Sequence, residues 1–226
     1  MLDSSRARIL GQLSTGDLVL DVGGWADPFE RADWVIDLLP YETRGLYGSR
    51  ERGDERFGED TWVARDICDR EPWPFADGQF DFAICSHTLE DVRDPVWVCR
   101  ELMRVARAGY VETPSRLEEQ AFGVQGPWVG WGHHHWLVDR TDEGLAFVFK
   151  HHILHARPDM QVPLERWRSA TPEERTVSLW WQGSFEVGER VFVGPGEIDD
   201  YLAEVAAPQT GSRWRRLRER ATARLR

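Results

Sequence analysis

The feature that most constrains the fold is a short apolar segment, Leu18 to Val22, which carries Asp21 and runs directly into Gly23 and Gly24. Consecutive apolar residues are typical of a strand that is buried on both faces of a sheet. A glycine has no Cβ atom, so a turn built on glycines lets the backbone approach a ligand closely. We therefore expect a ligand-binding loop at the end of a buried strand.

Similar apolar segments predict that more strands follow. They lie at 32–38, 62–67, 80–85, 109–112, 135–138 and 145–149, and helices are expected at 4–13 and 95–106. The segment 176–194 is typical of a hairpin or small sheet, because two turn sequences interrupt its apolar residues. Strands that alternate with helices favour an α/β fold with parallel strands and right-handed crossovers.

Charge and composition exclude several classes of protein. The formal net charge of -11 argues against a nucleic-acid partner. No segment has the roughly 20 apolar residues of a transmembrane helix, and the first residues lack the features of a signal peptide. Three cysteines, Cys68, Cys85 and Cys99, lack zinc-site spacing and favour a reducing cytoplasm. The arginine-rich segment 213–226 predicts a basic amphipathic helix, either docked on the protein or facing an anionic partner.

Polar residues follow the predicted strands where a parallel α/β sheet binds its ligand, beyond the carboxyl ends. Asp37 ends the second strand and could accept both hydroxyls of a ribose. Asp66 ends the third and could accept from an adenine amino group. Ser86 and His87 follow the fourth strand. These positions predict a nucleotide-like ligand along one rim of the sheet.

The glycine loop disfavours a phosphate. From Gly23 the chain reads GGWADP, which breaks the G-x-G-x-x-G pattern of dinucleotide sites, and no GK[ST] sequence occurs. Asp27 would also place a negative charge near a phosphate group. A nicotinamide-dependent oxidoreductase is therefore disfavoured, and the acidic loop suits a positively charged ligand such as a sulfonium.

The middle of the chain resembles a known family. It reads PFADGQFD from Pro74, SHTLEDVRDP from Ser86 and ELMRV from Glu101. This pattern resembles the class I S-adenosylmethionine-dependent methyltransferases, in the group that reads PFxDGxFDxxxxSxxLEHVxDPxxxxxELxRV. The resemblance covers about 19–114. It implies a Rossmann-like, mostly parallel sheet of seven strands, the last one reversed, with helices on both faces and a C-terminal β-hairpin and helix elaboration.

The resemblance also implies which residues bind S-adenosylmethionine. The expected cofactor residues are Asp21, Gly23, Gly24, Trp25, Asp37, Asp66, Ile67, Ser86 and His87. Trp25 departs from the family pattern, which has a glycine there, and Asp91 stands where the family has histidine. We expect residues 1–150 to form the cofactor-binding domain. Residues 151–226 would form an elaboration that packs on it as an acceptor lid or interface.

Three consecutive histidines, His133, His134 and His135, follow a loop rich in glycine and tryptophan. Histidine is a natural general base near neutral pH, so these residues are the predicted catalytic residues. On an extended chain the central histidine would point away from its neighbours, which makes His134 the first choice. Structural histidines and metal ligands remain alternatives.

These observations predict an S-adenosylmethionine-dependent O-methyltransferase that acts on a hydroxyl of a small polar acceptor or oligosaccharide, with a saccharide preferred. Tryptophans could stack on a sugar ring, Trp180 or Trp181 among them. A C- or N-methyltransferase of small molecules and a noncatalytic partner with this fold are the alternatives. Some sugar O-methyltransferases of this fold use a divalent ion, for which Glu90, Asp91 and Glu112 are candidates. A homodimer is also open.

Overall fold

The structure is a computed structural model that describes residues 1–46 and 55–206. The amphipathic helix predicted at 213–226 lies outside the described residues. Residues 47–54, between the second and third strands, also lie outside them.

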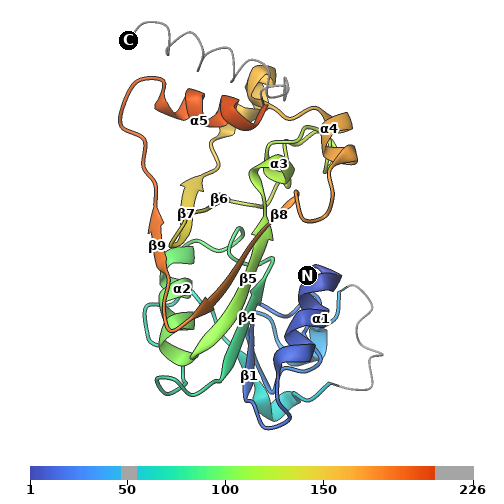
Figure 1. Ribbon diagram of the computed structural model, residues 1–226, viewed down its shortest axis with the longest axis vertical. Helices are drawn as coiled ribbons and strands as arrows, with labels where there is room; N and C mark the ends of the chain where they lie inside the picture. The colour runs from blue at the N-terminus through green and yellow to red at the C-terminus, as the bar shows by residue number, and fades with distance from the viewer. Residues whose placement is uncertain (47–54, 207–226) are drawn as a thin grey trace, which may run out of the picture.

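A six-stranded sheet forms the centre of the described chain, in the order β3-β2-β1-β4-β5-β8 (Figure 1). Its first five strands in the chain pair in parallel and only β8 runs antiparallel, so the predicted reversed last strand is confirmed. Six strands are found in this sheet in the described part, where seven were expected. The strands are β1 (Val19–Val22), β2 (Trp34–Asp37), β3 (Trp62–Ala64), β4 (Phe82–Ser86), β5 (Ala108–Pro114) and β8 (Thr176–Gln182).

Helices cover both faces of this sheet, as expected. The helix α1 (Asp3–Gln12) packs Ile9 against one face, where Val19 and Ile84 point. The helix α2 (Pro95–Val105) packs its apolar side on the opposite face, with Leu20 and Ala83. It begins where it does because the Asp94 side chain accepts a hydrogen bond from the Trp97 backbone N–H at 2.9 Å and proline occupies the first helical position.

A second sheet of three strands packs on the α2 side through a shared apolar core. It contains β6 (Trp136–Arg140), β7 (Gly144–Phe149) and β9 (Glu186–Glu189). The predicted hairpin of β8 and β9 is wrong, because β8 pairs with β5 and β9 pairs with β7. Phe185 explains the difference: it is buried between the sheets against Trp181, so the chain crosses from one sheet to the other after Gly183.

Short helices connect these strands and close the far end of the molecule. The last helix of the described residues, α5 (Glu197–Ala206), lies at this end (Figure 1). It buries Leu202 in a third apolar core with Leu137 and Val148. No helix among the described residues has the length and apolar character needed to cross a bilayer. The remaining helices are η1 (Tyr41–Thr43), η3 (Glu59–Thr61), α3 (Arg116–Glu119), η4 (His152–Ala156), η5 (Pro158–Met160) and α4 (Leu164–Ser169).

Candidate functional site

A cavity of about 940 Å³ lies where the carboxyl ends of β1, β2, β4 and β5 meet the turn before β6. Every residue that the sequence singled out for cofactor binding or catalysis lines it, although they come from segments far apart in the chain. These residues are Asp21, Gly23, Gly24, Trp25, Asp37, Asp66, Ile67, Ser86, His87, His133, His134 and His135.

The two glycines after β1 are required by the packing around them. Gly23 has a φ of +75°, and a Cβ atom there would lie 2.2 Å from the Thr88 hydroxyl oxygen. A Cβ atom on Gly24 would lie 2.3 Å from a carboxylate oxygen of Asp21. The loop therefore passes close to β4 and to the end of β1, along one wall of the cavity.

Asp21 and Asp37 are buried acids on the two strands that meet at this loop. Asp21 accepts a hydrogen bond from the Phe29 backbone N–H at 2.8 Å, and burial raises its pKa to about 7. Asp37 accepts from the backbone N–H groups of Trp25 at 3.0 Å and Leu39 at 2.9 Å. Burial raises the pKa of Asp37, and these hydrogen bonds oppose the rise. Each oxygen of Asp37 thus accepts one backbone hydrogen bond and keeps capacity for a second donor.

Asp66 is held differently, in a contact that the sequence did not reveal. One of its oxygens accepts from the Cys68 backbone N–H at 2.9 Å, and the other pairs with the Arg93 guanidinium at 2.5 Å. Burial raises the pKa of Asp66, but the hydrogen bonds from Arg93 and Cys68 and the charges of Arg93 and Arg65 together outweigh it, and the net direction is down. Asp66 therefore stays ionised at the cavity wall.

The end of β4 carries a strained residue and an unpaired hydroxyl. His87 has a φ of 53°, a left-handed backbone that is unusual for a residue other than glycine. Its Nε2 lies 3.0 Å from Glu112 Oε1 and its Nδ1 lies 3.5 Å from Glu90 Oε1. Burial lowers the pKa of His87, but the two carboxylates outweigh this and raise it to about 9. Ser86 Oγ, beside it, is buried and has no hydrogen-bond partner in the part of the chain that the structure describes.

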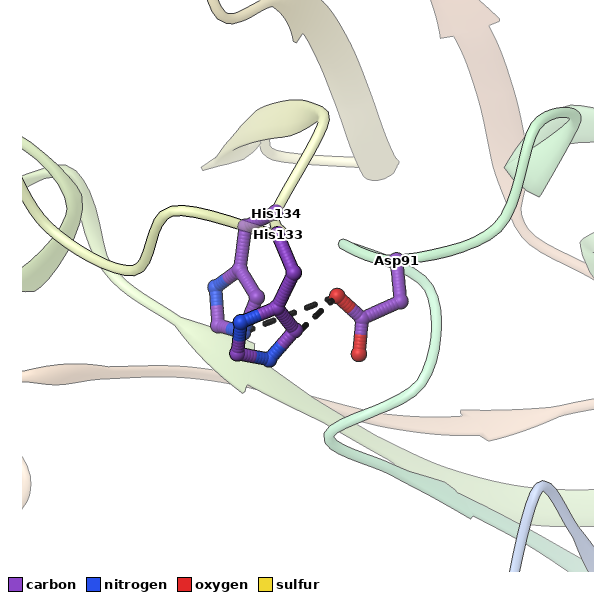
Figure 2. A group of neighbouring side chains, drawn as sticks. All are labelled: Asp91, His133 and His134. Atoms are coloured by element: carbon purple, nitrogen blue, oxygen red, sulfur yellow. Dashed lines mark ion pairs between the residues drawn. The ribbon is translucent and has the colours of Figure 1, made fainter.

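The histidines before β6 lie on a turn rather than on an extended chain. The His134 backbone N–H donates to the Trp131 carbonyl at 3.4 Å, which closes the turn. As a result His133 and His134 both face Asp91, with their Nε2 atoms 3.9 Å and 3.6 Å from Asp91 Oδ1 (Figure 2). The expectation that His134 points away from both neighbours is therefore wrong. The side chain of His135 also lines the cavity.

A buried chain of polar contacts holds His134. Its Nδ1 lies 2.6 Å from Glu119 Oε1, and the other Glu119 oxygen accepts from Lys150 Nζ at 2.6 Å. The Glu119 side chain is fully buried and that of His134 is 7% exposed. Burial lowers the pKa of His134, but the Glu119 hydrogen bond and the charges of Glu119, Glu90 and Asp91 together outweigh it and raise the pKa above its ordinary value. Sequence reasoning missed Glu119, and the only signal for Lys150 was that it is the single lysine of the chain.

The tryptophans divide between core and cavity. Trp181 is buried between the sheets, and Trp180 packs on the α1 side against Tyr110 and under Arg8. Neither lines the cavity, whereas Trp131 does, with its indole N–H bonded to Glu118 Oε1 at 3.1 Å. Trp131 is therefore the aromatic side chain on the histidine side of the cavity.

Comparison with known proteins identifies the central part of the chain. Residues 47–111 match the model of the methyltransferase domain family. No curated protein matches the chain in sequence.

Solved structures give weaker similarities. The YcgJ protein from Bacillus subtilis is 18% identical over 50% of this chain and 52% of its own, with a TM-score of 0.39, so the chain spans about half the length of that protein. A SAM-dependent methyltransferase from Aquifex aeolicus is 19% identical over 63% of this chain and 84% of its own, with a TM-score of 0.41. A phosphoethanolamine N-methyltransferase from Haemonchus contortus is 19% identical over 50% of this chain and 28% of its own, with a TM-score of 0.38.

Proposed function

We propose that this chain, an S-adenosylmethionine-dependent methyltransferase, methylates a hydroxyl group of a small polar acceptor, and that the acceptor is a saccharide. The single observation that carries the proposal is the shared cavity. Its strand-end wall holds the nucleotide-type acids and glycines, and its other wall holds the histidines and Trp131.

The strand-end wall has the chemistry to hold the cofactor. Asp37 is buried, is fixed by two backbone N–H groups and keeps acceptor capacity for two hydroxyls. Ser86 Oγ is a buried polar atom without a partner, which a bound ligand would satisfy. Asp21 adds acidic character that suits a cation, and Asp66 stays available at the rim. When bound, S-adenosylmethionine supplies a methyl group on a positively charged sulfur.

The opposite wall suits a hydroxyl-bearing acceptor. Trp131 offers an aromatic ring, and sugars stack their C–H faces on such rings. Pro172, Arg175 and Thr176, which precede or begin β8, complete this side. The C-terminal elaboration thus acts as part of the acceptor wall.

The histidine cluster activates the hydroxyl in one of two ways. In the first, His134 accepts the proton at Nε2, since Glu119 holds its Nδ1. In the second, Asp91, His133 and His134 would hold a divalent cation, which would lower the pKa of the hydroxyl. His87 is less suited to accept the proton, because its two carboxylate neighbours keep it protonated at neutral pH.

The test combines binding with methyl transfer. Purified protein is titrated with S-adenosylmethionine by calorimetry and then incubated with methyl-labelled cofactor and a panel of mono- and oligosaccharides, phenols and amines. We expect micromolar-range binding and a labelled methyl ether on a sugar. Label on amines alone would overturn the hydroxyl assignment. Cofactor binding with no transfer to any acceptor class would favour a noncatalytic role.

A further inference from the structure

We propose that Asp91, His133 and His134 form a binding site for a divalent transition-metal ion on the acceptor side of the cavity. The role of the ion in the reaction rests on the proposed function. The binding of the ion rests only on the contacts of these side chains.

The spacing of the three side chains fits a shared ion. One ligand atom from each lies within 4.8 Å of the others, and Asp91 Oδ1 lies 3.6 Å and 3.9 Å from the two Nε2 atoms (Figure 2). These distances exceed the roughly 2.7–3.2 Å of a hydrogen bond. Two ligands bonded to one ion at about 2.0–2.2 Å lie roughly 3.0–3.6 Å apart. The Asp91–His134 distance of 3.6 Å lies at the upper end of this range, and the Asp91–His133 distance of 3.9 Å lies slightly above it.

The ring orientation of His134 also fits a metal ligand. A metal-binding histidine almost always donates its other ring N–H to a carboxylate or carbonyl, which fixes the tautomer. Glu119 Oε1 occupies that position, 2.6 Å from His134 Nδ1, and Lys150 holds Glu119 in turn. The lone pair of His134 Nε2 is then directed at Asp91.

Unpaired acidic atoms beside the cluster provide an independent observation. The side chain of Glu90 is 1% exposed and lines the cavity, yet neither of its oxygens has a hydrogen-bond partner among the described residues. Asp91 Oδ1 is likewise buried without a hydrogen bond. Unpaired buried carboxylate oxygens are costly. Among residues 1–46 and 55–206, that carboxylate of Glu90 has one ion-pair partner, His87, whose Nδ1 lies 3.5 Å from Glu90 Oε1. A cation between Asp91 and the two imidazoles would bond the unpaired Asp91 oxygen and would add positive charge beside Glu90.

The ligand set determines the class of ion. Two imidazoles and one carboxylate suit Zn²⁺, Fe²⁺, Co²⁺ or Mn²⁺ better than Mg²⁺ or Ca²⁺, which prefer oxygen ligands only. Three protein ligands leave at least one position open. An acceptor hydroxyl at that position would have a lowered pKa and would lose its proton to solvent water. Its oxygen would then form the bond to the methyl carbon as the carbon–sulfur bond breaks, and the electron pair would stay on sulfur.

The test measures metal binding directly on untagged protein stripped with a chelator. Co²⁺ is the probe, because its visible absorption reports nitrogen ligation and coordination geometry, and calorimetry gives the dissociation constant. We expect one ion per chain. We expect His133→Ala, His134→Ala and Asp91→Asn each to weaken Co²⁺ binding by about 100-fold or more. Glu119→Gln, which acts through His134, should weaken it by roughly 10–100-fold.

Controls separate the possible outcomes. His155→Ala removes an exposed histidine outside this cavity and should leave Co²⁺ affinity unchanged. His133 has a 58% exposed side chain, so its variant tests the site without a buried change. Equal Co²⁺ affinity in the parent, His133→Ala and His134→Ala proteins would overturn the site. Titration of S-adenosylmethionine into stripped protein tests the proposed function separately. Cofactor binding without Co²⁺ binding would reject this inference alone, and the converse would leave the ion site standing without its role in methyl transfer.

Discussion

The pH dependence of stability provides a sharp test of the buried acid at the end of β1. Asp21 is 4% exposed, and burial raises its pKa from 3.8 to about 7 in the folded protein. A carboxyl with a raised folded-state pKa has no effect on stability through this shift while it is protonated in both the folded and the unfolded chain. Its contribution becomes unfavourable as the pH rises above the unfolded value. The cost therefore begins near pH 4 and is complete above about pH 7.

The size of the effect follows from the shift. Three pKa units correspond to about 4 kcal/mol, at about 1.4 kcal/mol per unit. Asp21→Asn keeps an oxygen that can accept from the Phe29 backbone N–H but removes the ionisation. The amide adds a fixed cost of its own, which does not change with pH. The difference in the free energy of unfolding between variant and parent should therefore shift by roughly 4 kcal/mol in favour of asparagine from pH 4 to pH 8.

Urea unfolding of both proteins at half-unit steps from pH 4 to pH 8.5 measures this difference, with equal m-values as the check for two-state behaviour. Asp142→Asn, a change on the exposed turn between β6 and β7, is the control and should give a nearly flat difference. A flat difference for Asp21→Asn as well would refute the reasoning, because it would mean that Asp21 has a similar pKa in the folded and unfolded chains.

Three further predictions concern the strand-end wall. Asp37→Ala removes the proposed ribose acceptor and should weaken S-adenosylmethionine binding by about 1.5–3 kcal/mol, or roughly 10- to 150-fold in calorimetry; unchanged affinity would reject the assignment. Gly24→Ala places a Cβ atom 2.3 Å from an Asp21 oxygen and should destabilise the protein by about 1–3 kcal/mol in urea unfolding, whereas Gly16→Ala, which meets nothing within 4 Å, should not. Glu112, whose pKa is lowered to about 2 because hydrogen bonds outweigh burial, stabilises the fold above about pH 4.5, and this contribution is lost as the pH falls through 2. Glu112→Gln should therefore cost about 3 kcal/mol in unfolding at pH 7 and much less at pH 3, and an equal cost at both pH values would contradict this.

The strand-end wall could be predicted from sequence because each of its residues has a local signature. Asp37 ends an apolar strand, and the two glycines directly follow one. In a parallel sheet the carboxyl ends of all strands lie at one edge. Residues that end or follow different strands in the sequence therefore lie around the same cavity. All nine predicted cofactor residues indeed line the cavity. Their roles toward the cofactor stay a prediction.

The contacts of the histidine wall could not be predicted, since they depend on tertiary packing. Glu119 belongs to a one-turn helix and meets His134 only because β5 and the turn before β6 are brought together in space. The orientation of His133 and His134 follows from a turn whose hydrogen bond ends at Trp131. The turn residues around β9 have the local pattern of a hairpin, so the sequence predicted one. The pairing of β9 with β7 in the second sheet depends instead on the burial of Phe185, which is a tertiary contact.

The two walls of the cavity are held by different means, and this bears on how the acceptor is chosen. Backbone N–H groups in the loops after β1 and β2 fix the carboxylates of Asp21 and Asp37. The imidazole of His134 is instead held by side chains, by Glu119 directly and by Lys150 through Glu119. A substitution on the histidine side of the cavity leaves the loops that hold the two acids unchanged. Acceptor preference should therefore be adjustable through Trp131 and its neighbouring turn while cofactor binding is retained.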